Sequence, residues 1–272
     1  MQGKIFMLTG AGISAESGLE TYRSVTGIWQ SHKMEEVATR DAFLRAPEKV
    51  WQFFALLKAA ADKAVPNSAH RAIAASMLKC KEMNIPFFLV TQNIDTLHER
   101  ALAEVGFPVS DCIAMHGRLS VSSCVKCRKS FNDPFIHFDS RGIDSNERVK
   151  HLAFFSELET LASVEHEKEH RLPLSPCCKD LLKPSVVLFG EEPQELNKCY
   201  SEVLGTSVFV AVGTSGKVAP ANEFARWAVR LNSGVRTIFV NTDQSAASDT
   251  FNEFFTGPAT EQVPFLISRL LS

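Results

Sequence analysis

The sequence predicts an α/β fold in which a doubly wound, mostly parallel sheet carries a smaller inserted domain. Short apolar runs typical of buried strands alternate with amphipathic helical segments, and these runs come from both ends of the chain. Two stretches, about 24–75 and 117–184, lack this alternation, so we expect them to fold back as one smaller domain. The 272 residues and a hydrophobic fraction of 45% suffice for a substantial core.

Six apolar runs are the expected strands. Residues 85–91 are the clearest, because IPFFLVT is continuously apolar and leads into the polar run QNID, as in a strand that is buried on both faces. Residues 4–9, KIFMLT, form a similar run before a glycine turn that is expected to open a helix. The other four runs span residues 110–115, 185–189, 207–212 and 235–240.

The helices between these strands are predicted from apolar residues three and four positions apart. Within the helical stretch 34–64, Thr39 or Asp41 is the expected cap of one helix, and Pro47 begins the next. The remaining helices are expected over residues 68–83, 95–101, 146–170, 192–204, 220–232 and 261–271.

Charge and apolar patterning exclude several classes of function. A net charge of -2 provides no strong field for nucleic acid or for an anionic membrane surface. No apolar run reaches the roughly 18 residues of a membrane span, and the N-terminal run enters a glycine turn instead of a cleavage site. We therefore expect a monomer in the cytoplasm. The seven cysteines, an odd number with two tight pairs, favour a metal site over disulfides.

The turn Gly10-Ala11-Gly12-Ile13-Ser14-Ala15 fits the G-x-G-x-x-G/A pattern of a Rossmann-like dinucleotide site. Glycines permit a tight turn and a close approach of pyrophosphate to backbone N–H groups, and a following helix adds a partial positive charge. A dehydrogenase would also need a second strand with an acidic end about 20 residues later. Glu35 and Glu36 lie at that distance but in a helical stretch, so hydride transfer is not supported.

Several further motifs occur in a fixed order and span nearly the whole chain. They are GAGISAESGLETYR (10–23), TQNIDTLHERA (91–101), MHG (115–117), CVKC (124–127), LKPSVVLFGE (182–191), VGTS (212–215) and VNTD (240–243). In this combination the chain resembles the sirtuin family. The stretches 27–39 and 257–264 look most like the bacterial and mitochondrial branch that removes acidic acyl groups.

The resemblance implies an NAD-dependent protein-lysine deacylase. Such an enzyme transfers the acyl group of a modified lysine in a protein or peptide to the ribose of NAD and releases nicotinamide. It also implies two domains. Residues 1–23, 76–116 and 185–272 would form the Rossmann-like NAD-binding domain, and residues 24–75 and 117–184 would form a small domain with a helical and a zinc-binding module.

The resemblance assigns catalytic roles to His116 and Asn93. An imidazole with a near-neutral pKa can take a proton from a ribose hydroxyl, which suits His116. Asn93 would hold ribose hydroxyls or an ordered water, and Asp95 the nicotinamide amide. Asn93 or Asp95 could also cap the following helix, and the two roles are compatible.

The cofactor contacts that the resemblance implies come from most of these motifs. They are Gly10, Ala11, Gly12, Ser14, Glu16, Thr21, Tyr22, Arg23, Trp29, Gln92, Asn93, Ile94, Asp95, Gly213, Thr214, Ser215, Asn241, Asp243 and Ala259. Tyr22 stands where the family usually has Phe, which keeps the ring that shields the reactive ribose face.

The expected substrate contacts are Ala15, Phe54, Leu57, Val187, Leu188, Phe189 and Gly190. The last four would pair with the peptide by strand addition. Phe54 and Leu57 stand where the acidic-acyl branch carries Tyr and Arg, so a succinyl carboxylate would find no partner. Ala15 is small where many sirtuins have Thr. We therefore expect a neutral acyl group, acetyl or longer.

A structural zinc site is expected at Cys124, Cys127, Cys177 and Cys178. Alignment back from LLKP puts Cys178 at the last ligand position and Ser175 at the third. Serine is a poor zinc ligand, so neighbouring Cys177 is expected to supply the fourth thiolate. His166 and His170 are rival ligands, although their charged helix favours solvated side chains. The role of the insertion 128–175 stays open.

Two other functions remain open at this stage. An ADP-ribosyltransferase would use the same NAD site but attach ADP-ribose to a protein side chain. A non-catalytic NAD-binding module would need neither His116 nor Asn93, and both are present.

Overall fold

The computed structural model describes residues 3–21, 33–132, 172–215, 221–243 and 249–272. The chain divides into two compact units, which we call the sheet unit and the small unit. The sheet unit comprises Met1–Arg23, Ala64–His116 and Pro193–Ser272, and the small unit comprises Ser24–Lys63 and Gly117–Glu192. This division differs from the expected boundaries at residues 64–75, which join the sheet unit, and at 185–192, which join the small unit.

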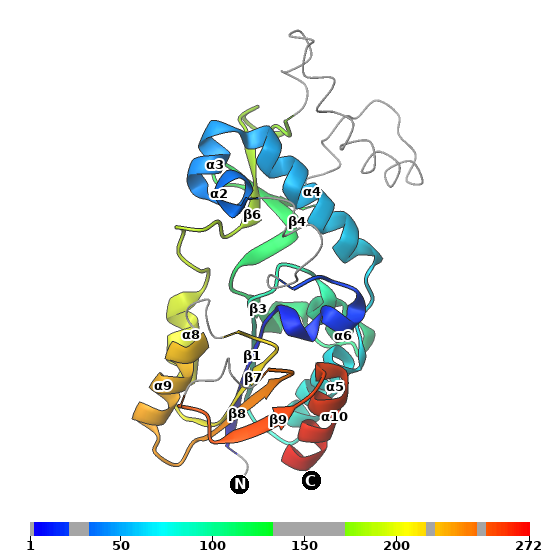
Figure 1. Ribbon diagram of the computed structural model, residues 1–272, viewed down its shortest axis with the longest axis vertical. Coiled ribbons are helices and arrows are strands. Elements are labelled where there is room, and N and C mark those ends of the chain that lie inside the picture. Colours follow the sequence, from blue (N-terminus) through cyan, green and yellow to red (C-terminus); the bar gives the residue numbers. More distant parts are fainter. Residues whose placement is uncertain (1–2, 22–32, 133–171, 216–220, 244–248) are drawn as a thin grey trace. The chain divides into compact units, whose positions relative to one another are not determined.

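Six strands form the centre of the sheet unit. They are β1 (Lys4–Thr9), β2 (Phe87–Thr91), β3 (Cys112–Ala114), β7 (Thr206–Val212), β8 (Arg236–Asn241) and β9 (Glu253–Thr256) (Figure 1). Their order is β3-β2-β1-β7-β8-β9, and all neighbours pair in parallel. The chain fills one side of β1 first and returns to fill the other, which confirms the doubly wound sheet. Ligands of such sheets bind beyond the carboxyl ends of the strands, where the order reverses.

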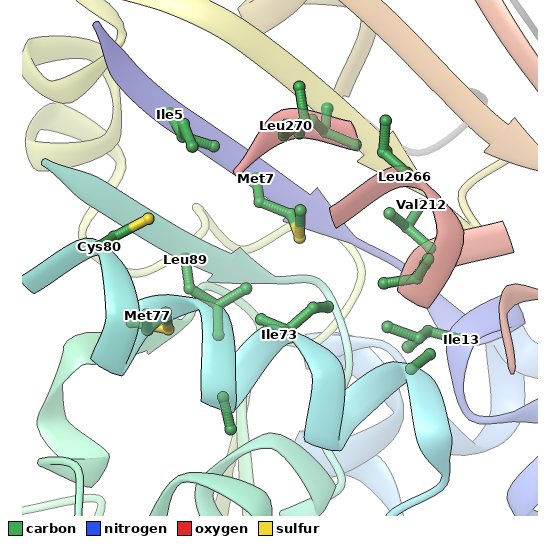
Figure 2. Close-up of a cluster of buried hydrophobic side chains, with 14 of the residues drawn as sticks. Ile5, Met7, Ile13, Ile73, Met77, Cys80, Leu89, Val212, Leu266 and Leu270 are labelled. Atoms are coloured by element: carbon green, nitrogen blue, oxygen red, sulfur yellow. The ribbon is translucent and has the colours of Figure 1, made fainter. Parts of the chain in front are cut away.

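Helices cover both faces of this sheet because side chains of each strand alternate between two cores. Ile5 and Met7 of β1 enter one core, and Phe6 and Leu8 enter the other. Figure 2 shows the first core. It is covered by α5 (Ser68–Glu82), α6 (Leu97–Glu104) and α10 (Ala259–Leu270), and the second by α8 (Leu196–Val203) and α9 (Ala221–Leu231). The packing of α5 against α6 and α10 explains why the segment before residue 76 belongs to the sheet unit.

In its described residues, the small unit combines three helices with a second sheet. The helices are α2 (Met34–Val37), α3 (Arg40–Arg45) and α4 (Pro47–Lys63), and the strands are β4 (Gly117–Cys124), β5 (Ser130–Asn132) and β6 (Leu182–Val186). The order β5-β4-β6 is antiparallel. Thr39 caps α3 by accepting a hydrogen bond from Ala42 N at 3.0 Å, as one of the two predicted caps. Trp51 Nε1 of α4 donates to Leu182 O at 2.9 Å and joins helix to sheet.

Several predicted elements need correction. The strand expected at 185–189 in the parallel sheet is β6, which ends at Val186 and pairs with β4 in the small unit. The place of a parallel strand is taken by β9, whose side chains are only half-buried or exposed, so its four residues lack a continuous apolar run. Strands β4 and β5 were not predicted because their sequence is polar. The helix expected over 146–170 lies outside the described residues. Among the described helices, none is both long and apolar enough to cross a membrane.

Candidate functional site

The carboxyl ends of five strands in the sheet unit bring the predicted NAD-contacting motifs to one edge. Backbone hydrogen bonds connect the segments just beyond these ends. Gly10 N donates to Val212 O at 2.9 Å, and Gln92 N donates to Thr9 O at 2.8 Å. Gly213 N donates to Val240 O at 2.9 Å. The sheet register therefore gathers residues as far apart in the chain as Thr9 and Val240.

Two glycine turns meet directly at the point where the strand order reverses. Gly12 N donates to Gly213 O at 2.8 Å, and a Cβ on Gly12 would lie 2.7 Å from Gly213 Cα. Gly213 has a φ of +60°, and its own Cβ would lie 2.5 Å from Ile13 N. Contact between the turns thus requires both glycines. The chain after Gly10 forms two short 3₁₀ helices, η1 (Ala11–Ile13) and η2 (Ala15–Ser17), so the predicted helix with its N-terminal charge is wrong.

A buried polar network lies beside these turns. Ser14 Oγ donates to Asp95 Oδ2 at 2.9 Å and accepts from Asn93 Nδ2 at 3.0 Å. Asp95 Oδ1 accepts from Leu97 N at 3.0 Å and so satisfies the first backbone N–H of α6, although Thr96 and not Asn93 or Asp95 occupies the N-cap position. Burial raises the pKa of Asp95, and the hydrogen bonds from Leu97 and Ser14 oppose this shift. The network fixes how Asn93 and Asp95 are oriented at the end of β2.

A pair of buried histidines that the sequence motifs did not predict lies behind this network. His70 Nε2 lies 3.4 Å from Ser14 Oγ, and His70 Nδ1 lies 2.9 Å from the Oδ1 of Asn67, which caps α5. Its ring meets the His98 ring edge-on, with 4.8 Å between centroids. Burial lowers the pKa of His70 to about 4 and that of His98 well below its usual value. An available signal was Asn67 followed three positions later by His70, a spacing typical of a capping box.

His116 follows β3, and its ring is held in one tautomer. His116 Nδ1 lies 2.8 Å from Gln92 O. Because a carbonyl oxygen only accepts, Nδ1 carries the hydrogen, and Nε2 of the neutral ring keeps its lone pair. Burial is the main cause that lowers the pKa of His116, so the ring is neutral near pH 7. The half-buried His116 is therefore suited to accept a proton at Nε2.

The ends of β7 and β8 are joined by side chains of the predicted set. Thr214 Oγ1 donates to Gln92 Oε1 at 2.9 Å, and Asn241 Nδ2 donates to Thr214 O at 2.8 Å. Asp243 N donates to Asn241 Oδ1 at 3.3 Å. Ala259 is buried at the first position of α10. These contacts position polar groups from β2, β7 and β8 along one edge.

The other predicted cofactor residues vary in exposure. The half-buried members are Ala11, Gly12, Thr21, Ile94 and Ser215, whereas Glu16 is exposed. Tyr22, Arg23 and Trp29 lie outside the described residues. The half-buried Ala15 belongs to η2.

The predicted acyl and peptide residues outside the glycine turn lie in the small unit. Phe54 and Leu57 belong to α4 and are 3% and 9% exposed. Val187–Gly190 follow β6, where Leu188 is buried and Phe189 is 47% exposed. The Lys58 ammonium, next to Leu57 in the chain, pairs with Asp62 at 2.6 Å. Phe54 and Leu57 thus supply apolar surface, whereas Lys58 lies one turn after Phe54 and its charge is paired with Asp62 within α4.

The cysteine cluster of the small unit has the geometry of a metal site. The sulfurs of Cys124, Cys127 and Cys178 all lie within 4.8 Å of one another. In a tetrahedral zinc site, bonds of about 2.3 Å separate the sulfurs by about 3.8 Å. Cys177 Sγ joins the group 3.3 Å from Cys127 Sγ. These four soft donors fit zinc, and all seven cysteines of the chain are free thiols.

Backbone geometry identifies Ser175 as the third ligand position. Cys127 N donates to Cys124 Sγ at 3.4 Å, which is the turn expected of a C-x-x-C pair. In the second turn, Cys178 N donates to Ser175 Oγ at 3.5 Å, so Ser175 stands where a sulfur would be. Cys177 Sγ lies 2.9 Å from the same oxygen. The thiol of Cys177 is thus next to the position that serine occupies.

Comparisons with known proteins agree on one family. A family model described as Sir2 family matches residues 10–220. The NAD-dependent protein deacylase of Pasteurella multocida (strain Pm70) is 35% identical over 274 residues, covering 99% of each chain. That of Bdellovibrio bacteriovorus (strain ATCC 15356 / DSM 50701 / NCIMB 9529 / HD100) is 34% identical over 270 residues, covering 98% of this chain and 96% of the relative. A solved Sir2 homologue–NAD complex has a TM-score of 0.74 and 31% identity, and the match covers 99% of this chain and 91% of that chain.

Proposed function

Because this chain belongs to the Sir2 family, we propose that it is an NAD-dependent protein-lysine deacylase. It transfers a neutral acyl group, acetyl or longer, from lysine to ADP-ribose and releases nicotinamide. The family confirms the resemblance that the motifs indicated. A single observation carries the chemistry: His116 donates from Nδ1 to Gln92 O and so keeps Nε2 as a base.

Different residues of the chain bind NAD and accept the proton during acyl transfer. NAD, when bound, supplies the ribose that receives the acyl group. His116 Nε2 takes the proton from a ribose hydroxyl, and its tautomer is set before substrate binds. Asn93 holds ribose hydroxyls or an ordered water, and Asp95 holds the nicotinamide amide. Ser14 links both side chains and fixes their orientation.

The edge of the sheet unit suits a dinucleotide. Thr214, Asn241 and Asp243 place hydroxyl, amide and backbone groups along it. Gly10 N and Gly12 N already donate to protein carbonyl groups, so these two glycines serve the turn itself. Phosphate contacts in our proposal come from Ala11 and Ser215 and from Arg23.

Neutral acyl groups are favoured by two apolar side chains of α4. Phe54 and Leu57 supply neither charge nor hydroxyl, and burying an unpaired carboxylate beside them costs several kcal/mol. A modified lysine enters from a peptide that pairs with Val187–Gly190. A solved Sir2 structure with a deacetylated p53 peptide, at 26% identity and a TM-score of 0.72, supports a peptide substrate.

Zinc in this proposal is structural. Cys124, Cys127 and Cys178 hold it, and Cys177 completes the tetrahedron. Four thiolates leave no open coordination position, so the metal stabilises the small unit and takes no part in acyl transfer. The free thiols also support a reducing compartment, and we place the chain in the cytoplasm as a monomer.

Matched acetyl, succinyl and fatty-acyl peptides with NAD test the proposal. We expect nicotinamide release, free lysine and O-acyl-ADP-ribose in solution, identified by mass spectrometry. ADP-ribose attached to the peptide would instead indicate an ADP-ribosyltransferase. Absence of turnover, with NAD still bound, would indicate a binding module, and a His116→Ala variant with unchanged turnover would contradict the mechanism.

A further inference from the structure

The segment Val187–Gly190 continues the course of β6 after its sheet partner has ended. The pairing of β6 with β4 ends at Val186. Even so, the alternation of buried and more exposed side chains continues through Phe189, with Leu188 buried. Val187–Phe189 therefore keep the alternation of a strand without β4, and the chain then turns, because Glu191 N donates to Leu188 O at 2.9 Å and Gly190 has a φ of +91°. Other contacts must maintain this form.

One edge of the segment is attached to the loop before α3. Phe189 N donates to Ala38 O at 2.8 Å, and Thr39 and Phe189 form an isolated parallel bridge. A single bridge provides little cooperativity, because a regular ladder would add a hydrogen bond at every second residue. This contact alone does not fix the backbone on both sides of Phe189.

An ion pair closes the segment from the other side. Lys183 Nζ lies 2.6 Å from Glu191 Oε2 and also donates to Val186 O at 3.2 Å. The same carboxylate oxygen accepts from Leu188 N at 2.9 Å, and Glu191 N donates to Leu188 O at 2.9 Å. The ion pair thus binds the backbone at both ends of the segment. Lys183 contacts Val186 O, and Glu191 contacts both the N–H and the carbonyl group of Leu188.

Burial makes this ion pair more stabilising than an ion pair on the protein surface. The side chains of Lys183 and Glu191 are only 19% and 25% exposed, so water screens their charges incompletely. Removing Glu191 would leave the Lys183 ammonium half-buried and Leu188 N without its side-chain acceptor, whereas removing Lys183 would leave the Glu191 carboxylate half-buried without its cation. The segment would then sample other conformations before a peptide could pair with it.

We propose that Lys183 and Glu191 are positioning residues for the acylated peptide, because their ion pair holds the turn at Gly190 and so keeps Val187–Phe189 in the form that a substrate strand needs. The inference rests on the proposed deacylase function and on peptide pairing with this segment. It assigns neither residue a role in proton transfer or in NAD binding. A defect should therefore appear in peptide affinity.

Steady-state kinetics of four proteins test the inference. For Lys183→Met we expect the peptide KM to rise about tenfold, with the NAD KM and kcat nearly unchanged. Glu191→Gln keeps an acceptor for Leu188 N and should raise the peptide KM less. Lys183→Arg should restore the wild-type value. Arg236→Met is the matched control, since it removes a 2.7 Å ion pair with Glu253 at the opposite end of β8 from Asn241.

The outcomes separate this inference from the proposed function. Wild-type protein without NAD-dependent deacylation would overturn both. An active wild type, with unchanged peptide KM in Lys183→Met and Glu191→Gln, would overturn the positioning role alone. The positioning role would also be overturned if the KM for NAD rose as much as the KM for the peptide. A Lys183→Arg variant whose peptide KM stays above the wild-type value would overturn it as well. Should Lys183→Met not fold, the isosteric Glu191→Gln and its peptide affinity without NAD decide the question.

Discussion

Acyl-chain preference depends on two side chains of α4. Phe54 and Leu57 are 3% and 9% exposed and offer no partner to a carboxylate. A succinyl group placed against them would lose the hydration of its charge, and a penalty of about 3 kcal/mol lies at the low end for such a group. Since about 1.4 kcal/mol corresponds to a factor of ten, we expect kcat/KM for a succinyl peptide at least about a hundredfold below that for the acetyl peptide.

Introducing the missing groups should reverse much of this difference. Phe54→Tyr combined with Leu57→Arg provides a hydroxyl and a guanidinium, and a charged hydrogen bond contributes about 1.5–3 kcal/mol. The ratio of succinyl to acetyl kcat/KM should therefore rise about 10- to 100-fold. Gln52→Arg is the matched control, because it adds the same charge to α4 about 140° around the helix from Leu57. The assay is deacylation of matched peptides at saturating NAD.

Three results would refute this reasoning. One is wild-type desuccinylation as fast as deacetylation, and another is a Gln52→Arg variant that shifts the ratio as much as the double variant. The third is a double variant that folds but leaves the ratio unchanged. Because a buried Arg can destabilise α4, melting temperatures should accompany the kinetics, and Phe54→Tyr alone provides a milder test.

Three further predictions concern protonation and metal. Burial lowers the pKa of His116, and His116 must be neutral to act as a base. We therefore expect kcat/KM to stay constant from pH 8 to 7 and to fall only below the usual histidine pKa of 6.5. A decrease in kcat/KM with a midpoint above pH 7 would contradict this. His70 has a pKa of about 4 when folded against 6.5 when unfolded, so the unfolded state binds more protons between these values. The free energy of unfolding should therefore fall by roughly 3 kcal/mol as the pH drops from 6.5 to 4. Urea titrations at several pH values should show a weaker pH dependence of this free energy for the His70→Gln variant. Metal analysis should find one zinc per chain. The Cys178→Ser and Cys177→Ser variants should each lose this zinc to a chelator more readily than the wild type. If Cys177→Ser keeps the zinc and Ser175→Ala loses it, the fourth ligand position belongs to Ser175.

The parallel sheet was predictable because its central strands are buried on both faces. Residues 5–8 and 208–212 are continuously apolar, and they lie in β1 and β7. β6 alternates instead, with Leu182 and Val186 buried and Lys183 half-buried, as in an antiparallel sheet with one covered face. The prediction used only the apolar part of that segment, 185–189, and therefore assigned the strand to the parallel sheet.

The site was predictable from motifs to the extent that strand ends coincide with them. Asn93 and His116 each follow a strand, and the register of the sheet brings those strands side by side. The histidines at 70 and 98 could not be assigned this way, because each lies on a helix whose spacing also fits an ordinary core residue. Only the fold reveals that their rings meet behind Ser14.

The glycine turn is therefore weaker support for NAD than its sequence implies. Gly12 and Gly213 are required by the contact between two turns, and this requirement would hold in a protein without any cofactor. The buried network beside them is different, because burial opposes the ionisation of the Asp95 carboxyl group, and hydrogen bonds from Leu97, Ser14 and Asn93 only partly offset that cost. This costly carboxyl group follows β2, the neighbour of the strand that His116 follows, and so fits the proposed contact with the nicotinamide amide.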